Sequence, residues 1–266
     1  IEINLGDGEK QYLYYDDSIL LKRLSLYPYV QLGVMVLFVL IVYFALISTK
    51  KAEQNKVWVG LSKETAHQLG TPISSLMAWM DLLESSGVDP SLLSDMNKDV
   101  NRLSVIAERF SKIGSKPEME LIYVNEVLEN ATEYMRRRVS DKVLITTHLP
   151  SDAEGAMVCL SLFEWVIENL CKNAVDAMNG EGRIDVYMTS EKQQIYIDIK
   201  DTGKGIARKN FKTVFNPGYT TKKRGWGLGL TLAKRIIEDY HAGRIYVKDS
   251  EVGKGTTFRI ELKRVV

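Results

Sequence analysis

The chain has few of the residues that build disulfide frameworks or zinc sites. Its 266 residues include only two cysteines, Cys159 and Cys171, and three histidines. Neither cysteine has a second metal-type pair or a histidine nearby in the sequence, so the pattern indicates neither kind of site. We therefore expect two buried free thiols in a reducing compartment.

A large net charge is missing as well. Lys and Arg number 35 and Asp and Glu 34, so the charges nearly cancel. This balance gives no electrostatic argument for a nucleic-acid partner, and we expect none. Hydrophobic residues make up 45% of the chain and charged residues 26%, an ordinary globular composition whose length allows one large domain or two to three small ones.

One segment departs from this composition. Residues 29–48, "YVQLGVMVLFVLIVYFALIS", carry no charge, and as a helix they would be about 30 Å long, the thickness of a bilayer core. Tyrosines lie near both ends, and two lysines follow at once. We predict a transmembrane helix over residues 29–49 in the cell (inner) membrane, with the C-terminal part of the chain in the cytoplasm. A buried core helix is the alternative.

Residues 1–28 are short and rich in turns. They contain two extended runs around Gly6-Asp7-Gly8, although an unstructured end fits the pattern equally well. Because the chain begins with Ile1 instead of Met, we expect this segment to be a fragment of an extracytoplasmic sensor region whose upstream part is missing.

Residues 53–114 contain two helical patterns separated by a turn in "SSGVDPS", residues 85–91. The first apolar stripe comprises Trp58, Leu61, Thr65, Leu69, Pro72, Leu76, Met80 and Leu83. The second comprises Leu92, Met96, Val100, Leu103, Ile106, Phe110 and Ile113. An isolated pair of helices cannot bury both stripes well, so we predict an antiparallel hairpin that dimerises into a four-helix bundle.

Beyond the linker "GSKPE", residues 118–266 alternate between helical and strand patterns. We expect a helix near 125–138, a strand near 142–148, and a long helix that a capping box from Ser161 to Glu164 opens. "RIDVYMTS" and "QIYIDIKD" predict a β-hairpin, a helix should end near Tyr240, and two more strands close the chain. The pattern predicts a two-layer α/β sandwich, and thus an α+β chain overall.

"SKETAHQLGTP", residues 62–72, places a histidine on the first of the two helices. If the stripe forms the core, His67 points about 200° away from Thr65 and from Leu69. It then faces solvent, and Glu64 and Thr71 share its face.

Pro72 removes the amide that would bond the carbonyl of Gln68, so we expect the helix to bend one turn after the histidine. An exposed imidazole beside a loosened backbone is accessible to a partner and can act as a nucleophile near neutral pH. A surface histidine without function is the alternative.

The C-terminal region contains two elements suited to a nucleotide. In "ENLCKNAVDAM", Asn169 and Asn173 lie four residues apart on one helix face, where amide oxygens can meet Mg²⁺ and phosphates. In "DTGKGI", Asp201 ends a strand and can accept a hydrogen bond from an exocyclic amine. Gly203 and Gly205 follow it and let the backbone approach a flat base.

Two glycine-rich turns complete the pattern. "KKRGWGLGL" places Gly225, Gly227 and Gly229 at a helix start, where free amides favour phosphate. "GKGTTF", residues 253–258, adds a tight turn with two hydroxyls. Each element alone also fits a simple loop or turn, but the four in this order indicate nucleotide binding.

With these motifs, residues 53–266 resemble a membrane-bound sensor histidine kinase of two-component signalling. "HQLGTP" is similar to the phospho-acceptor box, "ENLCKNAVDAM" to the N box, "FKTVFNPGYTTK" to the F box, and "DTGKGI" and "GWGLGL" to the two glycine boxes. The resemblance implies a Bergerat ATP-binding fold, a homodimer, and transfer of a phosphoryl group from ATP through the chain to an aspartate of a response regulator.

The resemblance also implies residue roles. His67 would be phosphorylated, Asn173 would bind Mg²⁺, Asp201 would contact adenine, and Thr71 would position water when the regulator is dephosphorylated. The other residues that it places at ATP are Asn169, Gly203, Gly205, Thr221, Lys222, Gly225, Gly227, Leu228, Gly229 and Thr256.

The sequence departs from the family directly after the histidine. Gln68 occupies the position that usually holds Glu or Asp as a general base, and an amide cannot take a proton at neutral pH. Glu64 on the same face is a candidate substitute, and proton loss to water is the other.

Two rival functions remain. In ATP-hydrolysing relatives of this fold a glutamate lies four residues before the magnesium asparagine, a position that Asn169 holds here. Glu168 is displaced from it by about 100° around the helix. The other rival is a nucleotide-binding membrane scaffold with little kinase activity, for which Gln68 is the best argument.

Overall fold

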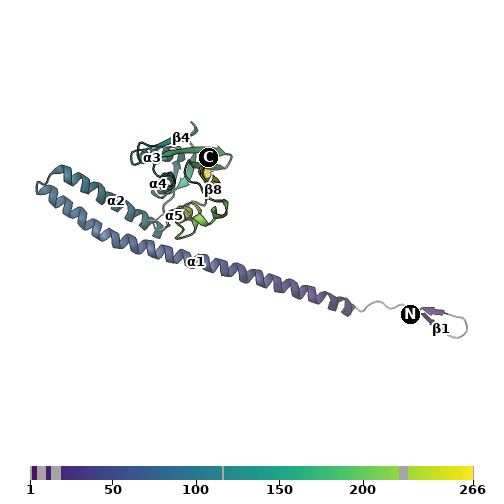
Figure 1. Ribbon diagram of the computed structural model, residues 1–266. Coiled ribbons are helices and arrows are strands. Elements are labelled where there is room, and N and C mark those ends of the chain that lie inside the picture. The colour runs from purple at the N-terminus through teal and green to yellow at the C-terminus, as the bar shows by residue number, and fades with distance from the viewer. Residues whose placement is uncertain (1, 5–9, 13–18, 116, 222–226, 266) are drawn as a thin grey trace. The chain divides into compact units, whose positions relative to one another are not determined.

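The computed structural model describes residues 2–4, 10–12, 19–115, 117–221 and 227–265. The chain forms two compact units, Ile1–Trp58 and Val59–Val266. One long helix, α1 (Ile19–Ser85), begins in the first unit and ends in the second. Figure 1 shows the helices and strands with the labels used below.

The first unit contains a short antiparallel pair and the apolar part of α1. β1 (Glu2–Asn4) pairs with β2 (Lys10–Tyr12), as the two extended runs predict, whereas the expected turn at Gly6-Asp7-Gly8 lies outside the described residues. In α1, Leu26–Lys50 has a mean hydropathy of 2.7 and is long and apolar enough to cross a membrane. Its side chains are exposed on the described chain, which argues against the alternative of a buried core helix.

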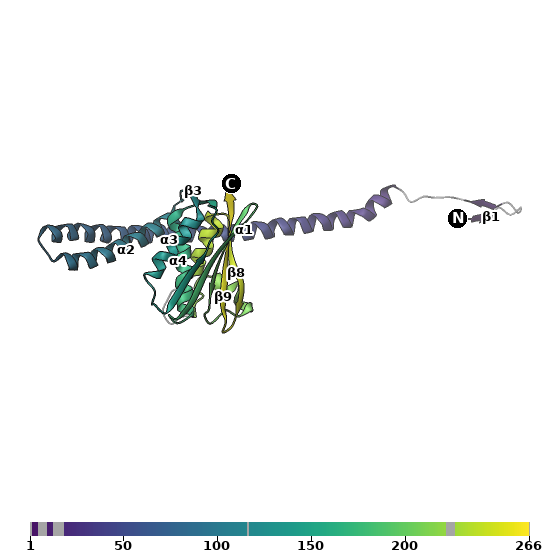
Figure 2. The ribbon, with the colours of Figure 1, turned by 90° about the horizontal axis from the view of Figure 1, so that it is seen from above.

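The second unit begins with a helical hairpin. α1 continues past Pro72 to Ser85, and α2 (Pro90–Gly114) returns alongside it (Figures 1 and 2). The turn between them falls where the sequence predicts it. Asp89 caps α2 by accepting a hydrogen bond from the Ser91 amide at 2.9 Å, and Gly87 adopts φ +77°.

The seam of the hairpin is narrower than the predicted stripes. Ile73, Met80, Val100 and Ala107 are buried, with Leu69 and Leu76 packed against them. Several other residues of the stripes are exposed on the single chain, because two helices facing each other bury only one line of side chains each. The stripe residues that remain exposed are Leu61, Pro72, Leu83, Leu92, Met96 and Leu103.

Residues after the hairpin form a sheet with helices. The strands are β3 (Glu120–Tyr123), β4 (Val143–His148), β5 (Gly155–Val158), β6 (Gly182–Glu191), β7 (Gln194–Asp201), β8 (Arg244–Glu251) and β9 (Gly255–Val265). The helical elements are α3 (Val124–Arg136), α4 (Leu160–Ala177), η1 (Arg208–Asn210), η2 (Thr213–Phe215), α5 (Gly229–Arg235) and the π-helix η3 (Ile236–Tyr240). The strand order is β3-β5-β9-β7-β6-β4, with β8 paired to β9, and the pair of β4 and β6 is parallel.

Alternating side chains divide the sheet into two faces. Ile184, Ile197 and Ile260 are fully buried, as is Phe163 of α4, and α3 and α4 lie on one side of the sheet (Figure 2). Between these inward residues the same strands carry polar side chains such as Asp198, which binds Arg259 through both carboxylate oxygens at 2.6 and 2.7 Å. The predicted two-layer sandwich and α+β class are confirmed.

Two predictions on local structure were wrong. β3 and β5 had no counterpart in the sequence pattern, because each has only four residues and pairs mainly with the other. The capping box at Ser161 is absent: α4 begins at Leu160, and the Ser161 hydroxyl instead accepts a hydrogen bond from Lys112 Nζ at 2.8 Å. The amide of Cys159, the residue before the helix, donates to Nε2 of the buried His241 at 3.0 Å. Both cysteines are free and buried, as expected.

Candidate functional site

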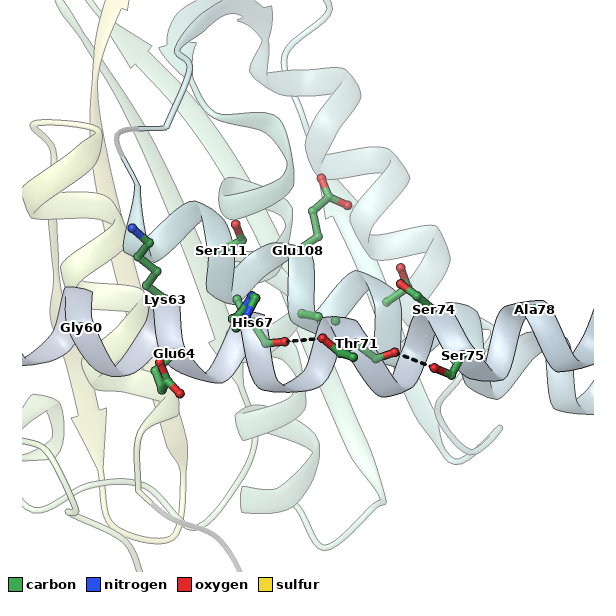
Figure 3. Close-up of a pocket in the computed structure, with 14 residues that line it drawn as sticks. Gly60, Lys63, Glu64, His67, Thr71, Ser74, Ser75, Ala78, Glu108 and Ser111 are labelled. Atoms are coloured by element: carbon green, nitrogen blue, oxygen red, sulfur yellow. Dashed lines mark hydrogen bonds between the residues drawn. The ribbon is translucent and has the colours of Figure 1, made fainter.

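His67 lies in an open groove between α1 and α2. The side chain is exposed, as the face argument predicts, and the groove has a volume of about 1180 Å³. Figure 3 shows His67 and Thr71 on α1 opposite Glu108 and Ser111 of α2. Small residues such as Gly70 also line the groove, so a partner can approach the imidazole closely.

Gln68, the residue after His67, is hydrogen-bonded to Glu64. Gln68 Nε2 donates to Glu64 Oε1 at 2.6 Å across one helical turn. Both side chains are exposed, and Glu64 also lines the groove that contains His67. The amide therefore holds a carboxylate on the turn that carries the imidazole, although Gln68 has no acidic group of its own.

Thr71 lies one turn beyond His67 and is also exposed. Its hydroxyl donates to the carbonyl of His67 at a long 3.5 Å, and Ser75 donates to the carbonyl of Thr71 at 3.2 Å (Figure 3). A bond at 3.5 Å is weak, so the Thr71 hydroxyl can rotate toward a group docked in the groove.

The nucleotide motifs come together around α4 and the end of β7. Asn169 and Asn173 are half-buried one turn apart on α4. A methyl group on Gly229 would lie 2.6 Å from Asn169 Oδ1, so the start of α5 packs directly against the first asparagine. Leu228 is the residue that precedes α5.

Asp201 is held at the end of β7 with only 3% of its surface exposed. Its Oδ1 accepts from the amides of Gly203 at 2.8 Å and Thr256 at 3.3 Å. Burial raises the pKa of the Asp201 carboxyl, and the two amide bonds oppose that rise. Gly255, at φ +118°, lets the next turn approach, because a Cβ there would collide with the carbonyl oxygen of Asp201.

The segment before α5 is partly described. Thr221 Oγ1 accepts from Lys204 Nζ at 2.9 Å, which links the "DTGKGI" turn to the end of the F-box segment. Gly227, at φ +66°, packs against Gly218. Lys222 and Gly225, which the sequence places at ATP, lie outside the described residues, as does Trp226.

The groove around His67 is built by the helical hairpin. All of the residues that line the groove around His67 belong to α1 or α2, and none of the described residues of the sandwich lines it. The asparagines, Asp201 and the glycine turns form a separate site on the sandwich.

Sequence reasoning missed a set of contacts beside the first asparagine. Arg109 of α2 binds both carboxylate oxygens of Glu168 at 2.9 and 2.6 Å. The position of Glu168 next to Asn169 was visible in the sequence, but no spacing rule connects it to a partner 59 residues away.

Comparisons with known proteins agree with this arrangement. The family model "Histidine kinase-, DNA gyrase B-, and HSP90-like ATPase" matches residues 158–266. Sporulation kinase A of Bacillus subtilis (strain 168) is 26% identical over 220 residues, which cover 80% of this chain and 36% of that protein. Sensor histidine kinase ZraS of Salmonella typhimurium is 26% identical over 226 residues, which cover 82% of this chain and 48% of that protein. The chain thus spans less than half the length of these relatives.

A solved structure shows the same fold. The histidine kinase ThkA, in complex with the response regulator protein TrrA, superimposes with a TM-score of 0.53 at 19% identity, over 81% of this chain and 64% of that one. Residues 158–266 thus match the ATPase family model, and about four fifths of the chain is similar to sensor histidine kinases.

Proposed function

We propose that this protein is an ATP-dependent histidine kinase that phosphorylates itself on His67 and passes the phosphoryl group to an aspartate of a response regulator. The observation that carries the proposal is the open groove around His67 in a chain that also has an ATP-binding domain. The other two histidines are engaged. Both ring nitrogens of His241 are hydrogen-bonded, and His148 stacks on Tyr187 at 4.4 Å.

The chemistry needs few protein groups. A ring nitrogen of His67 attacks the γ-phosphorus of ATP, the bond from that phosphorus to the β–γ bridging oxygen breaks, and ADP leaves. The imidazole loses its ring proton to the Glu64 carboxylate, which the hydrogen bond from Gln68 holds nearby. In the second step a regulator carboxylate attacks the phosphorus, the P–N bond breaks, and the proton returns to the imidazole.

The sandwich supplies the nucleotide site in this proposal. Asp201 accepts from the adenine amino group, and its burial makes that hydrogen bond selective. Asn173 binds Mg²⁺, with Asn169 beside it, because amide oxygens and phosphates are ligands that Mg²⁺ accepts. The close packing of Gly229 on Asn169 leaves the amides at the start of α5 near the phosphates. The other residues that we assign to ATP are Gly203, Gly205, Thr221, Lys222, Gly225, Gly227, Leu228 and Thr256.

The same groove suits dephosphorylation of the regulator. We assign Thr71 to positioning the water that attacks a phospho-aspartate of the regulator, since its hydroxyl is exposed and only weakly bonded. Thr71→Ala should then lower regulator dephosphorylation by about 10²-fold while His67 phosphorylation stays largely intact. If the hydroxyl only bonds back along the helix, the variant changes both rates together or neither.

Two features support a membrane-bound homodimer. Leu26–Lys50 suits a membrane span, which would leave the hairpin and the ATP-binding domain in the cytoplasm and residues 1–28 outside. On the hairpin, exposed apolar residues such as Leu61, Leu92 and Met96 would be covered in a four-helix bundle of two chains. We accordingly divide the chain at residues 1–28, 29–49, 53–114 and 118–266.

Labelling with γ-labelled ATP and Mg²⁺ tests the main proposal. The purified protein should take up an acid-labile, base-stable phosphate that His67→Ala abolishes and His148→Ala retains. Nucleotide binding without any label would favour the membrane scaffold instead, and an acid-stable phosphate would point to Ser or Thr. Steady ATP hydrolysis without labelling would favour the ATPase, although the Glu168 carboxylate is already bound by Arg109.

A further inference from the structure

The sheet of the ATP-binding domain has a second face, which points away from α3 and α4 (Figure 2). One register row on this face crosses β8, β9, β7, β6 and β4, and it comprises Tyr246, Arg259, Asp198, Tyr187 and His148. Residues opposite each other on neighbouring strands point to the same face of a sheet. We call this surface the outer face, to which every second residue along these strands belongs.

The carboxylates of the outer face lie low, and the cations stand above them. The side chains of Asp185, Asp198 and Glu261 are only 6%, 14% and 13% exposed. Asp198, for example, binds Arg259 at 2.6 Å and Lys248 at 2.7 Å. The exposed charges on its described strands are mainly cations, namely Arg183, Lys200, Arg244, Lys248 and Lys263, beside the carboxylates Glu191 and Asp249. The outer face therefore suits an anionic partner.

One corner of the outer face is apolar. Leu121 and Tyr123 of β3 are 59% and 51% exposed, and Met157 of β5 is 44% exposed. The registers of β3 with β5 and of β5 with β9 put these three side chains, the apolar corner, on the same face as Lys263. Apolar side chains next to tyrosines and cations are typical of surfaces that bind at a membrane interface.

The chain is short enough between the predicted membrane span and the apolar corner for the two to meet at one bilayer. The helical stretch of α1 from Lys50, where the apolar segment ends, to Lys63 is about 20 Å long. Gly114 packs on Lys63, because a Cβ on this glycine would lie 2.9 Å from the Lys63 amide nitrogen. The linker from Gly114 to Glu120, where β3 begins, extends to about 20 Å as well. The linker can therefore cover the distance back to the bilayer.

We propose that the outer face docks on the anionic cytoplasmic leaflet of the membrane, with the apolar corner in the interface and the cations on lipid phosphates. The inference rests on the membrane span in the proposed function. Asp201 is buried on the opposite side of β7, in phase with Ile197 and Ile199, so a docked domain keeps its nucleotide site open to the cytoplasm. Neutral lipids and high ionic strength weaken the docking.

The modification rate of lysines in nanodiscs tests the docking. The full-length protein is placed in discs of phosphatidylcholine, or of equal parts phosphatidylcholine and phosphatidylglycerol, and treated with an amine-reactive reagent, to which neither lipid reacts. In the anionic discs Lys200 and Lys263 should react about fivefold more slowly or less, because one basic side chain near an anionic surface contributes about that factor to binding. Lys98 on the hairpin, whose side chain is 72% exposed, should react equally in both.

Matched pairs of variants locate the contact. Arg244 on the outer face and Arg137 at the end of α3 are 72% and 77% exposed, and each pairs with a glutamate. Arg244→Gln should restore most of the reactivity of Lys263 in anionic discs, whereas Arg137→Gln should leave it low. Tyr123→Ser and Tyr134→Ser repeat the comparison for the apolar corner, because Tyr134 is similarly exposed on α3.

Equal reactivity of Lys263 in the two kinds of disc would overturn the proposal. Protection that persists in lipid-free detergent would overturn it too, because a second copy of the chain then covers the outer face. If the chain does not stay in nanodiscs, the proposed span fails, and flotation with anionic vesicles decides the docking alone. Flotation that Arg244→Gln loses and Arg137→Gln keeps supports the docking, and absence of flotation refutes it. None of these readouts requires phosphorylation of His67, so the kinase function can fail independently.

Discussion

The two halves of the proposed reaction are built in opposite ways. His67 stands on an exposed helix face, where Glu64 and Thr71 form hydrogen bonds within their own helix. Asp201 is buried in the sheet, and backbone amides from two separate turns hold its carboxylate. One region is exposed, and the other is fixed before any ligand arrives.

This difference follows from what each region must bind. An adenine-selective pocket gains affinity from groups that need no reorganisation, so a rigid, buried acceptor suits it. A phosphoryl acceptor has to meet an ATP-binding domain and then a regulator, so its surroundings must stay accessible to two surfaces in turn. Buried, backbone-held residues should therefore tolerate substitution far less than those around His67.

Substitution of Asp201 should have the largest effect, and it should act on ATP affinity. Asp201→Ala removes the buried acceptor and leaves two amides unsatisfied, so ATP affinity should fall by about 100-fold or more. Calorimetric titration with a non-hydrolysable ATP analogue measures the effect. Asp201→Asn keeps an oxygen for the amides of Gly203 and Thr256 and serves as the folding control, with the same loss of adenine selectivity. Equal affinity in wild type and Asp201→Ala would refute the assignment.

Two Gly→Ala substitutions compare how an added methyl group in each region changes the free energy of unfolding. Gly255→Ala should lower the free energy of unfolding by more than about 2 kcal/mol, because φ +118° is unfavourable for alanine and its methyl would meet backbone of Asp201. Gly70→Ala should raise it by up to about 1 kcal/mol, because this helical glycine has open space around it. Chemical denaturation of the purified protein, followed by circular dichroism, measures both. Similar losses in the two variants would contradict the comparison.

The stability of the sandwich should also depend on pH through His241. Burial lowers the pKa of this imidazole, while the bond from its Nδ1 to the carbonyl of Ile236 opposes the shift. The unfolded chain therefore binds the proton first, and the free energy of unfolding should fall as pH drops below about 6.5. His241→Gln keeps a donor and an acceptor but does not titrate. The difference between the two stability curves from pH 7.5 to 5.5 isolates the effect, and parallel curves would rule it out.

Sequence reasoning succeeded where a pattern is local. The exposure of His67 followed from a stripe at helical spacing. Asp201 lies at the end of β7 and both asparagines lie on α4, as the local patterns predict. The hairpin turn followed from Gly87 and Pro90. In each case residues close together in the sequence carry the signal.

Sequence patterns did not predict contacts between residues that are far apart in the chain. The ion pair of Arg109 with Glu168 joins residues that no period relates, and the amide of Cys159 before α4 donates to the distant His241. β3 and β5 are strands because they pair with each other and β5 pairs with the end of β9, a tertiary effect that overrides weak local preference. Long-range polar contacts of this kind need the fold before they can be assigned.

The smallest change in the rate of His67 labelling is expected from exchanging Glu64 and Gln68. If the carboxylate takes the imidazole proton, Glu64→Gln alone should slow His67 labelling about tenfold or more, since general bases contribute at least that much. Glu64→Gln combined with Gln68→Glu keeps one carboxylate and one amide one turn apart, so the 2.6 Å hydrogen bond can form in the reverse direction. The double variant should then label within about threefold of wild type, because the base has moved by one turn without leaving the exposed face. Its pH–rate profile should retain a carboxylate limb that Glu64→Gln loses. A single Glu64→Gln variant that labels at the wild-type rate would mean that water takes the proton, and that the open face of α1 needs no base at all.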